Sequence, residues 1–417
     1  MDKSKEIKKC RICDSQDLAP IISLGNQYVT NFIKDDNSGQ IKCPLELVLC
    51  KRCKLLQLKH NAPPESMWNE QYWYKSGISL TIKEDLKDIV ENVENIMNLK
   101  EGDIIVDIGC NDGTIFKFYN NKNINLLGVE PSKNVAKEAS KKGYDIINNF
   151  FNYEDYKEKF GDKKAKVITA ISMFYDLENP NEFMGDIVKI LDKEGLLVIQ
   201  QNYLVTMLKN NAFDNICHEH REYYSLLSLK NLLKKYNLEV FDIKQNSING
   251  GSIRTYIKFK GNDKIKGFEG SEKRLEEIKE IEREMQLDTL KPYLEFALRI
   301  NKIKEDLLDF IKKEKINGKK ICAYGASTRG NVILQYFDLD EKLITCIADK
   351  NPDKWEKRTV GNLIPIVSPE ELRKINPDYV LVMVWHFFEE IKKQEKEYFE
   401  KGGKFIVPLP KFRVIQK

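Results

Sequence analysis

The chain has 417 residues, 41% of them hydrophobic and 32% charged, a balance typical of folded domains rather than of disordered segments. Lysine and arginine (68) barely exceed aspartate and glutamate (64), so binding to nucleic acid through phosphate neutralisation is not expected. No apolar run reaches the roughly 18 residues of a membrane span, and the start MDKSKEIKKC does not resemble a signal peptide, which predicts a cytoplasmic protein without membrane association. The length predicts several domains, and the sequence leaves the oligomeric state open, a monomer being compatible with it.

Two pairs of cysteines stand near the N-terminus, Cys10-x-x-Cys13 and Cys50-x-x-Cys53. Each pair can lie on a tight turn that directs two thiolates at one cation, and together they predict a four-cysteine structural zinc site. The 36 residues between the pairs predict a small sheet, with Cys43 in the core. The alternative is reduced core cysteines that share this spacing by chance. The zinc-binding domain is expected to span residues 1–66, ending at the proline-containing stretch 61–64.

An aromatic segment (68–79) and a helical pattern through about residue 98 come next. Strands then alternate with helices from residue 103, and their apolar runs are IIVDIG, NLLGVE, AKVITAIS and GLLVIQQNYL. Buried parallel strands separated by helices predict an α/β domain with a doubly wound sheet. Residues 249–259 predict a glycine turn and a further strand, so this central domain is expected to span residues 67–262.

A charged helical stretch from about 271 to 316 predicts a helix that packs by one face and joins two lobes. After it the alternation resumes, with apolar runs at KKICAYG, LITCIAD, YVLVMVW and KFIVPLP. Residues 263–417 are therefore expected to form a linker helix and a second, smaller Rossmann-like domain.

The motif VDIGCNDG (106–113) follows the first central strand. Gly109 and Gly113 allow close approach to a ligand, while Asp107 and Asp112 put carboxylates where a dinucleotide would need an electropositive cradle. An acidic loop favours a ligand with a cationic end, and S-adenosylmethionine (SAM) carries both an ammonium and a sulfonium. Glu130 closes the next strand, at the position from which an acid reaches ribose hydroxyls. The sequence thus predicts a SAM site.

The segment FDNICHEHREYYS (213–225) brings together His218, Glu219 and His220. An imidazole beside a carboxylate can be held near a neutral pKa and can remove a proton from carbon or oxygen. A zinc site built on His-x-His lacks the i, i+4 helical spacing and a nearby third ligand. A polar helix start is the structural alternative.

Two further segments are candidates for substrate contacts. The phenols of Tyr72 and Tyr74 either pack at a domain junction or orient a sugar and stabilise an enolate oxygen. YGASTRGN (324–331) repeats the order of strand, turn and helix without an acid, so Arg329 and the helix N-terminus suit an anion such as diphosphate. A plain structural turn is the alternative for this loop.

In this order, CxxC…CxxC, VDIGCNDG, GVEPS, HEH, NGGSIR and YGASTRGN resemble the three-domain SAM-dependent sugar C-methyltransferases, which act on nucleotide-linked keto-deoxysugars. The resemblance spans almost the whole chain. It implies an N-terminal zinc-binding domain, a central SAM-binding domain and a C-terminal Rossmann-like domain that supplies much of the nucleotide-diphosphate pocket. It also implies that SAM is held by Asp107, Gly109, Asn111, Asp112 and Glu130.

The same resemblance implies roles for the histidine segment. His220 would be the general base, Glu219 and His218 would stand beside it, and Tyr74 would help to position the substrate. Residues of the remaining motifs are expected to contact the nucleotide-linked sugar: Tyr72, Asn249, Arg254, Tyr324, Ser327, Arg329 and Asn331.

One position departs from the family pattern Tyr-His-Glu-His, because Cys217 stands where the tyrosine is expected. A phenol that could donate to the sugar oxygen is missing there, unless Tyr223 or Tyr224 replaces it. The methylated atom is therefore open between carbon, through an enolate formed by His220, and a sugar hydroxyl oxygen. Outside this class, the alternatives are a methyltransferase of RNA or DNA, which the balanced charge disfavours, and a scaffold without activity.

Overall fold

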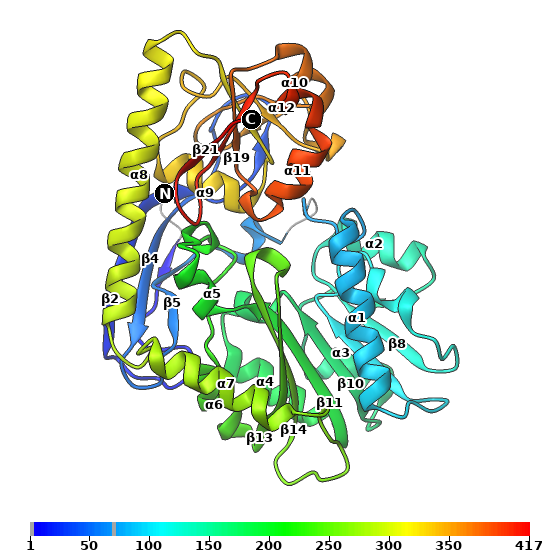
Figure 1. Cartoon of the computed structure of the whole chain (residues 1–417). Coiled ribbons are helices and arrows are strands. Elements are labelled where there is room, and N and C mark those ends of the chain that lie inside the picture. The colour runs from blue at the N-terminus through cyan, green and yellow to red at the C-terminus, as the bar shows by residue number, and fades with distance from the viewer. Residues whose placement is uncertain (1–3, 69–71) are drawn as a thin grey trace.

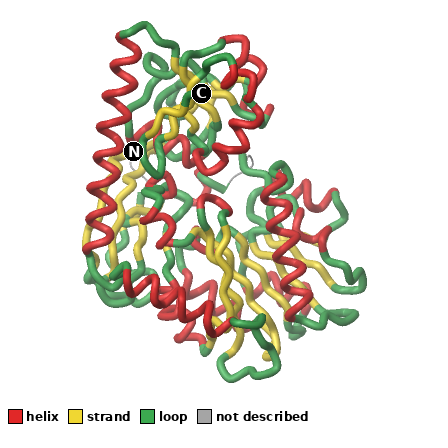
Figure 2. Tube along the Cα trace, in the orientation of Figure 1, coloured by secondary structure: helices red, strands yellow, loops and turns green. Residues whose placement is uncertain are grey.

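The computed structural model of the protein describes residues 4–68 and 72–417, which form three sheet-centred units (Figure 1). Figure 2 shows the sheets as yellow layers with helices beside them. Within the described residues, no helix combines the length and the apolar character that crossing a lipid bilayer requires.

The central unit is a seven-stranded sheet. Its strands, in pairing order, are β13 (Leu238–Asn246), β14 (Ser252–Phe259), β11 (Leu191–Asn202), β10 (Ala165–Ile171), β7 (Ile104–Ile108), β8 (Asn125–Val129) and β9 (Asp145–Ile147). The five strands from β11 to β9 are parallel, and β14 pairs antiparallel to both β11 and β13. All five residues of β7 are buried, as expected for a parallel strand covered on both faces.

Helices cover both faces of this sheet, which confirms the doubly wound α/β prediction. They are α1 (Leu80–Ile96), α2 (Lys133–Lys141), α3 (Tyr153–Phe160), α4 (Pro180–Ile190), α5 (Leu204–Lys209) and α6 (Leu226–Leu233). Helix α1 begins at the N-cap Ser79 and buries Ile82, Leu86 and Ile89 against one face of the sheet, together with Ile105 and Val167. Successive strand residues point to opposite faces, so Ile104 and Ile168 pack with the α4 side chains instead.

The N-terminal unit is a four-stranded antiparallel sheet in the order β12 (Glu222–Tyr223), β5 (Leu56–Leu58), β4 (Lys42–Cys50) and β2 (Leu18–Tyr28). The predicted small sheet between the cysteine pairs is therefore present, and Cys43 is fully buried. Its edge strand β12 comes from the central part of the chain. Two short pairs complete the unit, β1 (Lys5–Glu6) with β6 (His60–Asn61), and β3 (Phe32–Ile33) with β17 (Arg358–Thr359) of the C-terminal unit.

The C-terminal unit is a six-stranded sheet. Its order is β18 (Ile366–Val367), β16 (Ile347–Ala348), β15 (Ile321–Tyr324), β19 (Tyr379–Val382), β20 (Lys404–Val407) and β21 (Arg413–Ile415). All pairs are parallel except that of β20 with β21. Its helices are α9 (Thr328–Tyr336), α10 (Pro369–Ile375), α11 (Phe388–Gln394) and α12 (Lys396–Glu400). The predicted second Rossmann-like domain is confirmed.

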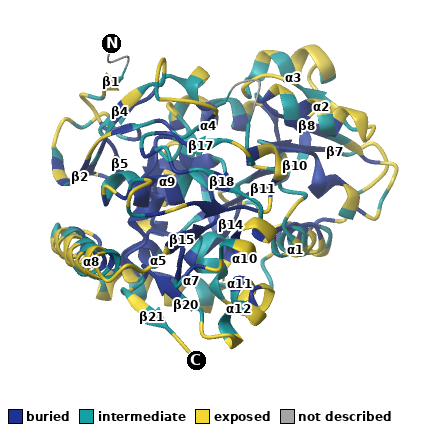
Figure 3. Cartoon of the chain, turned by 90° about the horizontal axis from the view of Figure 1, so that it is seen from above, coloured by how far each residue is buried: buried dark blue, intermediate teal, exposed yellow. Residues whose placement is uncertain are grey.

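The stretch from 271 to 316 differs from the prediction of one continuous helix. It forms two helices, α7 (Ser271–Glu284) and α8 (Lys291–Ile316), because Gln286 adopts a left-handed backbone (φ 55°) and Pro292 opens the second helix. Helix α8 runs alongside the N-terminal and C-terminal units (Figure 1), and its outer face is exposed in Figure 3. The expected domain boundaries at residues 66 and 262 stay predictions; strand β14, which ends at Phe259, belongs to the central sheet.

Candidate active site and zinc centre

The four cysteines of the two CxxC pairs converge at the end of the N-terminal sheet. The Sγ atoms of Cys10 and Cys53 lie 3.4 Å apart, those of Cys13 and Cys50 lie 3.5 Å apart, and all four lie within 4.8 Å of one another. These separations are far longer than the roughly 2 Å of a disulfide. They approach the roughly 3.8 Å expected between thiolates placed tetrahedrally at about 2.3 Å from one zinc ion. The donor set fits zinc and leaves no position open, as in structural sites.

The glycine loop after β7 forms the wall of a deep cavity. Gly109 has φ 73°, and a side chain there would collide with Met173, whose Cγ lies 2.8 Å from the position of a Cβ atom. Only glycine fits this close approach without strain. Asn111, also left-handed (φ 52°), turns the chain so that its backbone N–H donates to the Glu130 carboxylate at 3.0 Å. The loop and the end of β8 are thereby fixed to each other.

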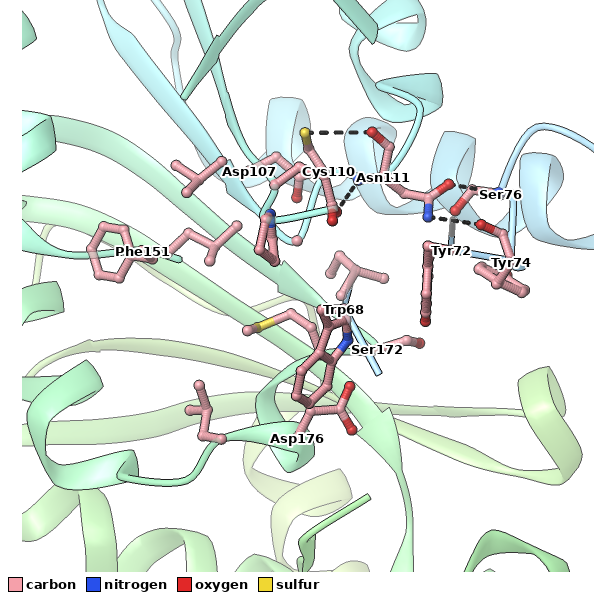
Figure 4. Close-up of a pocket in the computed structure, with 18 of the residues that line it drawn as sticks. Trp68, Tyr72, Tyr74, Ser76, Asp107, Cys110, Asn111, Phe151, Ser172 and Asp176 are labelled. Carbon is pink, nitrogen blue, oxygen red and sulfur yellow. Dashed lines mark hydrogen bonds between the residues drawn. The ribbon is translucent and has the colours of Figure 1, made fainter. Parts of the chain in front are cut away.

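The cavity has a volume of about 340 Å³, within the range of small-molecule sites. Asp107, Gly109, Asn111 and Glu130 all line it, together with aromatic side chains that include Phe150. Figure 4 shows Asp107 and Asn111 with the aromatic side chains of Trp68, Tyr72, Tyr74 and Phe151. Burial raises the pKa of Asp107 to about 7, although the hydroxyl of Thr169 donates to its carboxylate. Burial also raises the pKa of Glu130. Neither carboxyl is paired with a cation among the described residues, so both are suited to the cationic groups of SAM.

Asp112 and Gly113, also predicted to hold SAM, lie behind the loop rather than in the wall of the cavity. The Asp112 carboxylate accepts hydrogen bonds from the backbone and hydroxyl of Thr114 and pairs with Lys142 at 3.1 Å. A side chain at Gly113 would meet Tyr144 and Ala139. The structure thus gives these two residues contacts that shape the turn.

The tyrosine segment is held over the cofactor loop by asparagine side chains. Asn111 accepts from the backbone of Ser76 (3.0 Å) and donates to the carbonyl of Tyr74 (3.2 Å), as Figure 4 shows. Asn134 of α2 makes the same two-sided contact with the backbone of Tyr72, at 3.0 and 2.9 Å. Tyr72 and Tyr74 also line a second, smaller cavity of about 40 Å³, together with Glu219 and Thr328. The two cavities therefore share a wall.

The histidine segment sends its two imidazoles in different directions. The Nε2 atom of His218 lies 2.9 Å from the carbonyl oxygen of Cys43, so this side chain faces the N-terminal sheet, and burial lowers its pKa to about 4. The Nδ1 atom of His220 lies 3.0 Å from the carbonyl oxygen of Asn215, and its ring meets Tyr175 edge to face at 4.5 Å. The alternative of a polar helix start does not match the structure, because the chain continues from His220 into strand β12.

Burial and a nearby cation act on the charges of this segment. Burial lowers the pKa of His220 to about 3, and the charge of Arg329 acts in the same direction. Burial raises the pKa of Glu219 to about 7, an effect that a hydrogen bond with Thr328 partly offsets. The imidazole is thus neutral, and since Nδ1 must donate to a carbonyl oxygen, the lone pair is on Nε2.

The predicted substrate residues of the C-terminal domain meet the central domain at Arg329. Its guanidinium pairs with the fully buried Asp214 (Nε to Oδ2, 2.8 Å) and donates to the carbonyl of Asn249 at 2.5 Å. Ser327 caps α9 through a bond from the backbone N–H of Gly330. The structure thus brings Asn249 and Arg329 together at the contact between the central and C-terminal domains.

Three other predicted substrate residues lie elsewhere. Arg254 is buried and paired with Asp85 (2.9 Å) and Asp88 (2.7 Å), so it supports the cavity wall through Asp85 and does not line the cavity itself. The ring of Tyr324 packs in the small apolar cluster of the C-terminal sheet. Asn331 is 1% exposed, and its side-chain polar atoms have no hydrogen-bond partner among the described residues.

Sequence reasoning did not single out Tyr175 and Asp176, which follow strand β10. Tyr175 packs on His220, while Asp176 is half-buried, lines the cofactor cavity and has one buried carboxylate oxygen without a partner in the described part of the chain. Burial raises the pKa of Asp176 well above its usual value. Their place at the carboxyl end of a parallel strand was the available signal, since ligands bind at that edge.

Three family models match consecutive parts of the chain: a zinc binding domain over residues 10–68, a methyltransferase domain over 81–243 and a C-methyltransferase C-terminal domain over 247–410. The C-methyltransferase NovU of Streptomyces niveus is 30% identical over 420 residues, an alignment that covers 99% of this chain and 98% of NovU.

Solved structures overlap with less than half of the chain. The plantazolicin methyltransferase BpumL in complex with SAH matches 42% of this chain and 82% of its own, with 15% identity and a TM-score of 0.34. Magnesium protoporphyrin IX methyltransferase (ChlM) from Synechocystis PCC 6803 with bound SAM matches 42% of this chain and 78% of its own, with 10% identity and a TM-score of 0.32.

The predicted family, fold class and cofactors, SAM and zinc, are confirmed by the domain matches and the four-cysteine cluster. The similarity to NovU over nearly the full length of both chains shows that this protein belongs to the C-methyltransferase family, SAM-dependent enzymes with an N-terminal zinc-binding domain.

Proposed function

We propose that the protein transfers a methyl group from SAM to a carbon atom of a nucleotide-linked keto-deoxysugar, with His220 as the general base. The observation that carries this proposal is the wall shared by the two cavities. Tyr72 and Tyr74 line the acidic cavity that contains Asp107 and also the small cavity that contains Glu219. A donor in the first cavity and an acceptor beside the second would meet across these tyrosines.

The geometry of His220 suits proton removal from carbon. Its Nδ1–H donates to the carbonyl oxygen of Asn215, which fixes the tautomer and leaves the Nε2 lone pair without a hydrogen-bond partner among the described residues. The edge contact with Tyr175 fixes the plane of the ring. An imidazole that is already fixed in position and neutral loses little conformational entropy when the substrate binds. Such pre-organisation of the reacting groups is a large part of what a fold contributes to a proton transfer.

A ketone next to the target carbon makes the C–H bond acidic enough for this base. His220 takes the proton, and hydrogen-bond donors near the sugar, with Tyr74 as the first candidate, stabilise the enolate oxygen. SAM, when bound, supplies an electrophilic methyl group. Asp107 and Glu130 would hold its cationic and ribose portions in the first cavity, and the aromatic side chains would exclude water.

The C-terminal domain supports the nucleotide-diphosphate part of the proposal. The N-terminus of α9 and the guanidinium of Arg329 lie on the side that faces the central domain, where Arg329 contacts Asp214 and Asn249. Backbone N–H groups at a helix N-terminus and an arginine are typical diphosphate ligands. Thr328, the first residue of α9, also borders the small cavity of Glu219, which supports a sugar position between the two domains.

The test is mass spectrometry of nucleotide-linked 4-keto-6-deoxysugars incubated with SAM and the zinc-loaded protein. We expect the gain of one methyl group, and we expect carbon-bound deuterium to appear in D₂O without SAM, since His220 exchanges the proton by itself. His220→Ala should lose both signals, whereas the control His60→Gln, in the short strand β6 beside Glu46, should keep both. Methyl gain without deuterium exchange, on a sugar that lacks the ketone, would instead show O-methylation of a hydroxyl.

A further inference from the structure

A second set of metal-ligand atoms lies in the turn that carries the base. One ligand atom each from Cys217, Glu219 and His220 lie within 4.8 Å of one another. A thiolate, a carboxylate and an imidazole on one zinc ion are separated by roughly 3.3 to 3.8 Å, so closing the set needs shifts of about 1 Å. Rotation of the Glu219 side chain toward the small cavity that it lines can supply such a shift.

One carbonyl group in this turn accepts three hydrogen bonds. The oxygen of Asn215 accepts from the Cys217 backbone N–H (3.0 Å), from His220 Nδ1 (3.0 Å) and from the Tyr223 hydroxyl (3.1 Å). A histidine that binds metal through one nitrogen usually donates from the other to a backbone carbonyl or carboxylate. His220 already has this arrangement at Nδ1, which leaves Nε2 as the nitrogen that would bind a metal.

The electrostatic surroundings favour a cation despite the nearby arginine. Arg329 is neutralised by its buried ion pair with Asp214, at 2.7 Å. Asp176 and Glu219 are carboxyls that interact with Cys217 in this region, and Asp176 has an oxygen without a partner among the described residues. A positive ion would therefore reduce the repulsion between these partly buried acids, which Arg221 offsets only in part.

The chemistry of the donors selects the metal. A cysteine thiolate prefers soft or borderline ions such as Zn²⁺, Cd²⁺ and Co²⁺, whereas Mg²⁺ and Ca²⁺ take oxygen ligands. The family pattern has a tyrosine in place of Cys217, and a phenol is a poor ligand for these ions. Three protein ligands leave a fourth position open, unlike the closed site of the N-terminal cysteines.

We propose that Cys217, Glu219 and His220 form a second, exchangeable site for a thiophilic divalent cation, and that its occupancy inhibits methyl transfer. The inhibition rests on the proposed role of His220: a metal on Nε2 takes the lone pair that would accept the substrate proton. The metal site itself does not depend on that role.

Binding is tested with Co²⁺ added to the full-length protein in its zinc-loaded form. We expect a thiolate-to-cobalt charge-transfer band in the wild type that is absent from Cys217→Ser. Both proteins keep the four N-terminal cysteines, so their difference spectrum removes any exchange at the structural site. Glu219→Gln should weaken Co²⁺ binding at least tenfold while leaving the band. Equal spectra for the wild type and a folded Cys217→Ser, confirmed by circular dichroism, would overturn the proposal; Cys217→Ala provides the same comparison if the serine variant does not fold.

Inhibition is tested by methyl transfer with Zn²⁺ or Cd²⁺ as the probe and Mg²⁺ as the control ion. We expect at least a tenfold loss of rate that the sugar, but not SAM, relieves by competition, and Cys217→Ser should require at least ten times more metal. A cobalt band without inhibition would refute the regulatory part. A cobalt band in a protein that methylates no keto-sugar would refute the proposed function and support the metal site. Methylation of a keto-sugar by a protein that shows no cobalt band would support the proposed function and refute the metal site.

Discussion

The buried carboxyl of Asp107 should make the affinity for SAM depend on pH near neutrality. Asp107 lines the cofactor cavity, and burial raises its pKa to about 7. SAM is expected to pair with the ionised form, so its apparent dissociation constant scales with one plus the ratio of protonated to ionised carboxyl. Between about pH 8 and about pH 6 this factor grows about tenfold, which corresponds to roughly 1.4 kcal/mol. Affinity therefore falls as the pH falls through the pKa of Asp107.

Isothermal titration calorimetry of SAM at several pH values measures this effect. Asp107→Asn should bind SAM more weakly than the wild type at the higher pH and should show little change on acidification. The α-amino group of SAM titrates in the same range, but it does so equally for both proteins. Asp145→Asn, an exposed change at the edge of the same sheet where Asp145 pairs with Lys159, should match the wild type. A wild-type dissociation constant that is the same at both pH values, or an Asp107→Asn variant with the wild-type pH dependence, would refute the reasoning.

Three further predictions concern stability and metal content. Cys13→Ser should lose the structural zinc, as measured by elemental analysis, and should lower the midpoint of thermal unfolding by roughly ten degrees or more, since zinc binding supplies much of the folding energy of such a domain. A variant that keeps both its zinc and the wild-type midpoint would contradict the four-cysteine site. Glu282→Ala should lower the free energy of unfolding in urea by about 3 kcal/mol, because the buried carboxylate accepts from the Tyr203 hydroxyl at 2.9 Å and from two N–H groups at the start of α6. A loss below about 1 kcal/mol would count against this role. Arg254→Ala should lower the free energy of unfolding by about 3 to 5 kcal/mol and weaken SAM binding through Asp85. The control Lys244→Ala removes a largely exposed pair with Asp88 and should lower it by under about 1 kcal/mol. Equal losses for the two variants would show that burial of the Arg254 pair is irrelevant.

The parts of the fold that the sequence predicts are those encoded by neighbouring residues. The CxxC pairs, the buried run of β7 and its glycine loop each carry their signal within about ten residues, and the structure contains all of them. The break between α7 and α8 was missed although Pro292 was visible, because the charged helical pattern continues on both sides of it. A proline at the first position of a helix is a start signal as much as an interruption.

The site was less predictable, because tertiary contacts decide where each side chain points. His218 and His220 stand two residues apart, yet the first contacts the carbonyl of Cys43, far away in the sequence, whereas the second contacts that of Asn215, five residues before it. Arg254 follows the glycine turn as a substrate residue would, but the acids of α1 pair with it. Neither partner can be inferred from the local pattern, since pairing over such sequence distances requires the assembled sheet.

Strand β12 has a consequence for the order in which the molecule is built. The ribosome delivers the chain from its N-terminus, so the zinc-bearing sheet receives its edge strand, paired at Glu222 with Gln57, only after the first five strands of the central sheet have been made. Zinc can bind the four cysteines as soon as they are synthesised and can keep strand β5 in place for its later pairing with β12. The segment that carries His220 then pairs with that edge, so a nascent chain without zinc would complete its central sheet while strand β12 stays undocked.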